Sequence, residues 1–81
     1  MHINIDNLPP GVTVEELREF LGASDEIENI RLTDAGDADN VVAVVTVNTS
    51  QTGANAMAEF IDGRFYKERR VSARALTLLK E

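Results

Sequence analysis

The chain has 81 residues, the size of one small domain. Folding at this size buries only about 60 percent of the surface that the unfolded chain exposes. The chain has no cysteine, which excludes disulfides and thiolate metal sites. Its net charge of −6 at pH 7 argues against a general binder of polyanions. Neither a membrane span nor a signal-peptide pattern is visible, so we expect a cytoplasmic protein that starts at Met1 and makes no membrane contact.

Two apolar patterns in the first half of the chain predict strands. Ile3 and Ile5 alternate with polar residues over 2–6, so one face of this strand should be buried. The segment 7–11 contains two prolines and a glycine and should end the strand. The residues that mark the second strand are Ile27, Ile30 and Leu32 on the inner side and Arg31 and Thr33 on the outer side.

Two helices are predicted by their caps and their apolar spacing. Thr13 has the pattern of a capping box, with a glutamate three residues later, and predicts a helix over 14–21. A second helix should cover 51–61 after a cap at Ser50 or Thr52. The core stripes expected on these helices are Val14, Leu17, Phe20 and Leu21 on the first, and Ala54, Met57, Ala58 and Ile61 on the second.

The segment 41–47 is apolar on both faces, which places its strand in the centre of a sheet. A last strand should cover 70–75, followed by an apolar tail over 76–81. The order β-α-β-β-α-β predicts an α+β fold of the ferredoxin-like kind, a four-stranded antiparallel sheet with both helices on one face, in one domain over 1–81. The residues expected to face the helices from the central strand are Val41, Ala43, Val45 and Val47.

Several segments resemble the RNA recognition motif family. Ile3-Asn4-Ile5-Asp6-Asn7-Leu8 is similar to the family's first-strand hexamer, and 40–47 is similar to its third-strand octamer. The segments 14–20, 61–64 and 70–73 resemble its first helix, its Asn-Gly turn and its final strand. The resemblance covers nearly the whole chain and implies a module that binds single-stranded RNA on the open face of the sheet.

The positions where the family carries base-stacking aromatics hold none here; they are Asn4, Val42 and Val44. Stacking on an aromatic ring is worth about 1–3 kcal/mol per base, so we expect weak affinity for RNA. Arg31 and Arg74 should lie on the same face, where they either hold the phosphate backbone or simply solvate the sheet.

A second set of candidates lies between positions 64 and 74, which hold five of the eight basic residues, interleaved with Phe65 and Tyr66. Basic residues beside aromatics suit stacking and phosphate contact. The alternative is a charged loop in which one aromatic packs into the core. The predicted RNA-binding residues are therefore Asn4, Arg31, Val42, Val44, Arg74, Arg64, Tyr66, Lys67, Arg69 and Arg70.

Arg64-Phe65-Tyr66 also resembles the Arg-x-Phe loop of peptide-binding variants of the RNA recognition motif (RRM) in splicing factors, with Tyr66 in place of Phe. Those variants lack the sheet aromatics and have an acidic first helix, which Glu15, Glu16 and Glu19 would supply here. The resemblance implies a second hypothesis, the binding of a protein or peptide that offers a tryptophan and a basic stretch.

Val42 and Val44 form a small apolar patch that we expect other apolar residues to bury. We expect the tail residues Leu76, Leu78 and Leu79 to contact it, or a second subunit to bury it in a homodimer. Either arrangement would compete with RNA.

No enzyme, cofactor or metal site is predicted. His2 is the one histidine of the chain, and neither a nucleophile–base pair nor a glycine-rich phosphate loop is visible. Asp34, Asp37 and Asp39 lack the spacing of a calcium loop and should form a solvated turn.

Overall fold

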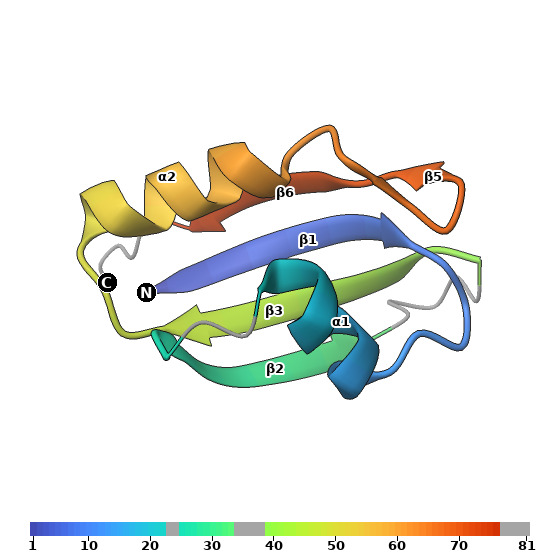
Figure 1. Ribbon diagram of the computed structural model, residues 1–81, viewed down its shortest axis with the longest axis horizontal. Coiled ribbons are helices and arrows are strands. Elements are labelled where there is room, and N and C mark those ends of the chain that lie inside the picture. The colour runs from blue at the N-terminus through green and yellow to red at the C-terminus, as the bar shows by residue number, and fades with distance from the viewer. Residues whose placement is uncertain (23–24, 34–38, 77–81) are drawn as a thin grey trace.

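The computed structural model describes residues 1–22, 25–33 and 39–76. Most of the predicted turn over 34–40 and the tail residues Leu78 and Leu79 lie outside these ranges. Figure 1 shows the two helices on the same side of one sheet. The main elements are β1 (His2–Leu8), α1 (Val14–Leu21), β2 (Ile27–Thr33), β3 (Val41–Val47), α2 (Gln51–Ile61) and β6 (Ser72–Leu76).

The sheet has four antiparallel strands in the order β2-β3-β1-β6, so β3 and β1 form its centre. This confirms the predicted ferredoxin-like α+β fold and the central place of the most apolar strand. Neither described helix is long and apolar enough to cross a membrane.

The alternation of side chains across the sheet follows the prediction. Ile3 is paired with Val45 and Ile5 with Ala43, and all four are buried under the helices. The intervening pair, Asn4 and Val44, belongs to the opposite face. The alternation therefore separates a dry helix-covered face from an open face.

A register shift in β2 explains why Ile27 and Ile30 are both buried. Residues three apart on a regular strand point to opposite faces. The pairing of β2 with β3 shifts between Ile27 and Asn29, which inserts the extra residue that brings both isoleucines to the core side.

The capping box of α1 is present as predicted. The backbone N–H of Glu16 donates to Thr13 Oγ1 at 3.2 Å, and the N–H of Thr13 donates to Glu16 Oε1 at 3.0 Å. The helix ends at Gly22, whose φ of 93° lies in the left-handed region that glycine adopts without strain. Leu17 anchors the helix in the core.

The second helix is capped by Ser50, because the N–H of Gly53 donates to Ser50 Oγ at 3.1 Å. Its stripe of small residues lets α2 approach the sheet closely. Asp62, the residue after the helix, accepts the N–H of Ala73 at 2.9 Å and so ties the helix end to β6. The buried residues of α2 are Ala54, Ala58 and Ile61.

The predicted final strand over 70–75 is wrong at its start. Phe65–Tyr66 (β4) and Arg69–Arg70 (β5) pair as a small separate hairpin, and β6 begins only at Ser72. Lys67 and Glu68 form the turn with φ of 50° and 68°, and a two-residue turn with both φ values positive matches the twist of the two strands that it joins. At the other end, Leu76 belongs to β6, where it is paired with His2, and not to a tail.

The two valines at positions 44 and 45 test the face assignment, because truncation to alanine removes the same two methyl groups. Val45 is 1% exposed, whereas Val44 is half-buried on the open face. Val45→Ala should lower the free energy of unfolding by about 2–3 kcal/mol, since core truncation loses both burial and packing. Val44→Ala should cost less than half of that. Urea denaturation measures both, and equal losses would contradict the assignment.

Candidate nucleic-acid interface

The open face carries one row of residues that crosses all four strands. Asn4 of β1 is paired with Arg74 of β6 on one side and with Val44 of β3 on the other, and Val44 is paired with Arg31 of β2. Neighbouring strands are about 4.8 Å apart, so the backbones of the two arginines are separated by roughly 14 Å. The fold thus places an arginine at each edge strand and an amide and a valine between them.

The side chains of the row and of Val42, which shares the open face, are accessible to different extents. Arg31 and Arg74 are exposed, whereas Asn4, Val42 and Val44 are half-buried. The predicted open-face residues are therefore brought together. Exposed guanidinium groups keep their hydration and remain available to phosphate.

Asp6 is a member of this face that the predicted site omitted. Its carboxylate Oδ1 accepts a hydrogen bond from Asn4 Nδ2 at 3.0 Å, and its backbone is paired with Ser72. The bond orients the Asn4 amide, and the carboxylate places a negative charge beside the row. Alternation along β1 already predicts Asp6 on this face, since every second residue of a strand lies on the same side.

The basic cluster predicted between positions 64 and 74 does not gather on one surface. The Arg64 guanidinium lies 5.0 Å from the ring centre of Phe20 and 4.8 Å from that of Phe60. Tyr66 packs against Phe20 at 4.8 Å between ring centres. Lys67 Nζ lies 2.6 Å from Glu16 Oε2. These contacts turn Arg64, Tyr66 and Lys67 toward the helices and away from the open face.

Arg69 is used to hold the end of the sheet together. Its Nη1 donates to the carbonyl oxygen of Leu8, at 3.3 Å, and to that of Asp39. Arg70 is exposed, and its carbonyl accepts a hydrogen bond from Asn7 Nδ2 at 3.0 Å. Among the interactions described, the side chains of Arg64, Lys67 and Arg69 make such internal contacts, and those of Arg70 and Arg74 do not.

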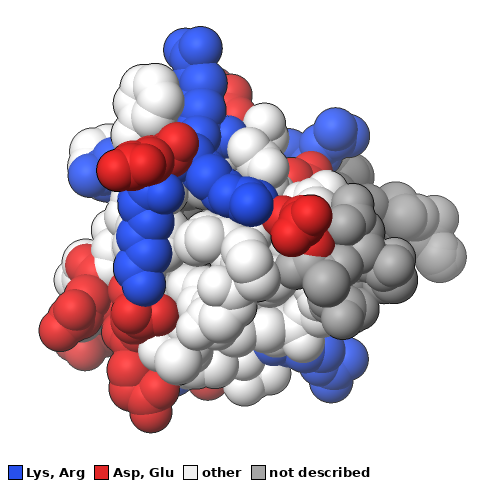
Figure 2. All heavy atoms as spheres, turned by 90° about the vertical axis from the view of Figure 1, so that its right-hand side faces the viewer, with Lys and Arg blue, Asp and Glu red and all other residues white. Residues whose placement is uncertain are grey.

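Asn40, the first residue of the segment that resembles the family's third-strand octamer, has a structural role. Its Oδ1 accepts the N–H of Asn7 at 2.9 Å. Asn7 has a φ of 68° at the point where the pairing of β1 with β3 shifts register. Figure 2 views this end of the molecule and shows Lys and Arg gathered over its upper part, with Asp and Glu among them. The end is therefore of mixed charge.

Electrostatics at α1 follow from the Lys67–Glu16 contact. The hydrogen bond from Lys67, followed by the one with the Thr13 backbone, lowers the pKa of the Glu16 carboxyl. The same bond raises the pKa of Lys67. Burial, and then the charge of Glu16, raise the pKa of Tyr66. Glu16 is thus engaged in both the cap and the ion pair, and Glu15 and Glu19 remain the exposed acids of α1.

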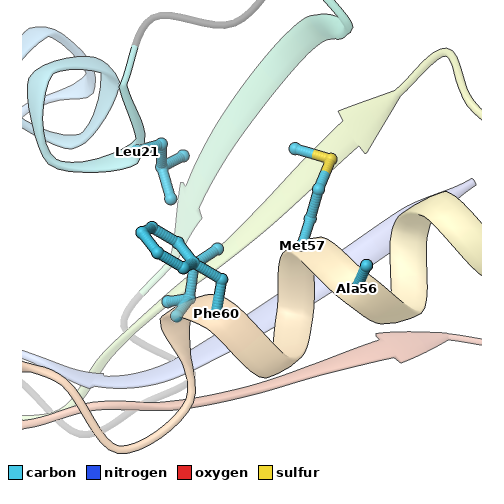
Figure 3. A pocket seen from close by; sticks show the side chains of 5 residues that line it. Leu21, Ala56, Met57 and Phe60 are labelled. Atoms are coloured by element: carbon cyan, nitrogen blue, oxygen red, sulfur yellow. The ribbon is translucent and has the colours of Figure 1, made fainter.

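An open apolar pocket of about 240 Å³ lies between the two helices. In Figure 3, Leu21 of α1 and Phe60 of α2 point toward each other across it. Phe60 is 67% exposed although it is large and apolar. Sequence reasoning missed this pocket; the available signal was that Phe60 lies off the core stripe of its helix. The lining residues are Leu21, Ala56, Met57, Phe60 and Ile61.

Metal binding finds no support in the part of the chain that the structure describes, where no three His, Cys, Asp or Glu side chains come together. Asp34 and Asp37 of the predicted solvated turn lie outside that part.

Comparison with known proteins points to one family. The family model described as RNA recognition motif matches residues 3–72. A solved structure described as Pes4 RRM3 Structure is similar with a TM-score of 0.79 and 19% identity, over 99% of this chain and 95% of that chain. At this identity the likeness supports the fold alone. No curated protein matches the chain.

The ion pair at α1 can be tested by titration. Lys67→Ala should raise the pKa of Glu16 toward its ordinary value of 4.5, because the bond from Lys67 is the largest cause of the lowering. A carboxyl whose pKa is lowered in the folded state stabilises the fold at pH values above its unfolded pKa, and this stability is lost as the pH falls through the lowered folded-state pKa. The difference in stability between the native chain and this variant should therefore shrink as the pH falls below about 4.5 and vanish below the lowered pKa of Glu16.

NMR titration of the Glu16 carboxyl carbon measures the shift, and denaturation at several pH values measures the convergence. Lys67→Arg is the matched control, because it keeps the positive charge. An unchanged Glu16 pKa in Lys67→Ala would show that the contact does not form in solution.

Proposed function

The chain belongs to the RNA recognition motif family, and on that premise we propose that it binds single-stranded RNA weakly on the open face of its sheet. The observation that carries the proposal is the row with Arg74 and Arg31 at its two edges and Asn4 and Val44 between them. A strand of RNA laid across the β-strands would meet both guanidinium groups at different phosphates. The arginines would position the backbone, as phosphate contacts do in general.

The middle of the row supports contact with bases but not stacking. Val42 and Val44 offer half-buried apolar surface without a π-system, and the Asn4 amide offers hydrogen-bonding groups. Each missing aromatic removes a stack worth about 1–3 kcal/mol per base. Asp6 and the net charge of −6 add repulsion. Weak, salt-sensitive binding with little base preference is the expected result.

Arg31→Ala and Arg74→Ala should each weaken the binding of short RNAs similarly for all sequences and reduce the slope of log affinity against log salt by about one unit. Arg18→Ala is the matched control, because Arg18 is exposed on α1, on the helix side of the sheet. Fluorescence anisotropy at several salt concentrations measures the slopes. Loss of affinity in the Arg18 variant equal to that in the other two would place the site elsewhere.

The converse change should strengthen binding. Asn4→Tyr combined with Val44→Phe restores aromatics at two paired positions in the centre of the row. A gain of about 1–3 kcal/mol per productive stack is expected in the same titration. If neither the native chain nor this variant binds any short RNA at low salt, RNA binding is not its function.

Peptide binding is the second candidate, favoured by the pocket between the helices. Phe60 and Leu21 form an apolar site for one large side chain, and Glu15 and Glu19 on α1 suit a basic neighbour. The structure alters the hypothesis in one respect. Tyr66, the predicted loop aromatic, is already packed on Phe20, so the pocket rests on Phe60 instead.

A short peptide with one tryptophan between lysines tests this candidate, because the chain itself contains no tryptophan. Burial of the indole should shift its emission to the blue on titration with the protein. Phe60→Ala should abolish the shift, and Phe65→Ala, an equally exposed site away from the pocket, should not. Unchanged emission with the native chain would remove peptides of this chemistry from consideration.

A further inference from the structure

Phe65 is the most exposed large apolar side chain in the described part of the molecule, at 71%. It lies on the β4–β5 hairpin, outside the core and outside the pocket between the helices. Scattered exposed apolar residues are common on protein surfaces. Phe65 differs from such scattered residues in the side chains that surround it.

The hairpin directs Phe65 and Tyr66 to opposite sides. Tyr66 packs inward on Phe20, and successive residues of a strand point to opposite faces, so Phe65 points outward. Phe65 is paired across the hairpin with Arg70. Residues directly opposite on paired strands share a face. An exposed ring and an exposed guanidinium therefore leave the same face of the hairpin.

Three hydrogen bonds hold the hairpin against α1 and the end of β1. Lys67 bonds to Glu16 of α1, Arg69 bonds to the carbonyl of Leu8 at the end of β1, and the Arg70 carbonyl accepts from Asn7. A ring presented by an anchored element loses little conformational freedom when it binds a ligand. The hydrogen-bonded hairpin thus holds Phe65 in a defined position, which suits a side chain that binds a ligand.

We propose that Phe65 and Arg70 form a stacking site for a base of single-stranded RNA, the aromatic platform that the open face lacks. The inference rests on the proposed function and extends its surface. Arg70 and Arg74 are four residues apart and both exposed, and Arg74 is already part of the open-face row. A single RNA strand follows the row to Arg74, passes the edge of β6 and stacks one base on Phe65, with its phosphate near Arg70.

The first test compares two exposed phenylalanines in anisotropy titrations with a labelled, mixed-sequence short RNA at low salt. Phe65→Ala should weaken binding about fivefold or more, which is the effect of losing one stack. Phe60→Ala, with 67% exposure, should leave the affinity unchanged. Both side chains are exposed, so both variants should retain the native NMR spectrum.

The second test uses the absence of tryptophan from the chain. Phe65→Trp should preserve RNA affinity, and its emission should be quenched saturably by RNA as a base stacks on the indole. Phe60→Trp should show no saturable quenching. Arg70→Ala should lower the salt slope by about one unit.

The outcomes separate this inference from the proposed function. If Arg31→Ala and Arg74→Ala weaken binding but Phe65→Ala does not, the stacking site is wrong and the open-face site stands. Equal effects of Phe65→Ala and Phe60→Ala would also overturn the stacking site. If Phe65→Ala weakens binding and the open-face arginine variants do not, the hairpin site stands and the open-face site is wrong. If no RNA binds the native chain, both fail.

Discussion

The antiparallel pairing of β1 with β3 is the constraint on which both faces of the sheet depend. It brings Ile3 to Val45 on the helix side and, one residue along, Asn4 to Val44 on the open side. A shift of one residue would exchange the two faces. The buried side resists such a shift, because each large apolar residue there contributes about 1.5–3 kcal/mol by burial. The packing of the helix-covered face therefore decides which residues lie on the open face.

That open face is chemically unusual for the family. Its polar and aliphatic residues give it neither strong stacking nor a strongly positive field, and Asp6 lies beside the row. Where aromatics are missing, phosphate contacts dominate affinity, and those contacts are weakened by salt. If the open face binds RNA as proposed, its affinity should be weak and should depend on additional contacts outside the sheet.

The hairpin that carries the proposed stacking site is bonded to the rest of the fold. Glu16 completes the cap of α1 with one carboxylate oxygen and binds Lys67 with the other. The helix start and the hairpin are thus joined through one side chain. The Arg64 guanidinium lies near the rings of Phe20 of α1 and Phe60 of α2 and so contacts both helices. Basic residues that seemed free in the sequence are in this way used to orient Phe65 and Arg70.

Local pattern was enough to determine the order of the two helices and the four strands of the main sheet, the cap at Thr13 and the inward faces of these strands, because these depend on near neighbours and on a fixed side-chain period. The second cap stayed open between Ser50 and Thr52, and the structure places it at Ser50. It was also enough to place Arg31, Arg74, Asn4 and Val44 on one face. Only the tertiary structure decided which residues of the basic cluster are available, since Lys67 and Arg69 find partners 51 and 61 residues away. The β4–β5 hairpin and the pocket beside Phe60 were likewise decided by long-range packing. The position of Phe60 off the core stripe marks it as exposed, but only the packing of α1 against α2 brings Leu21 to it.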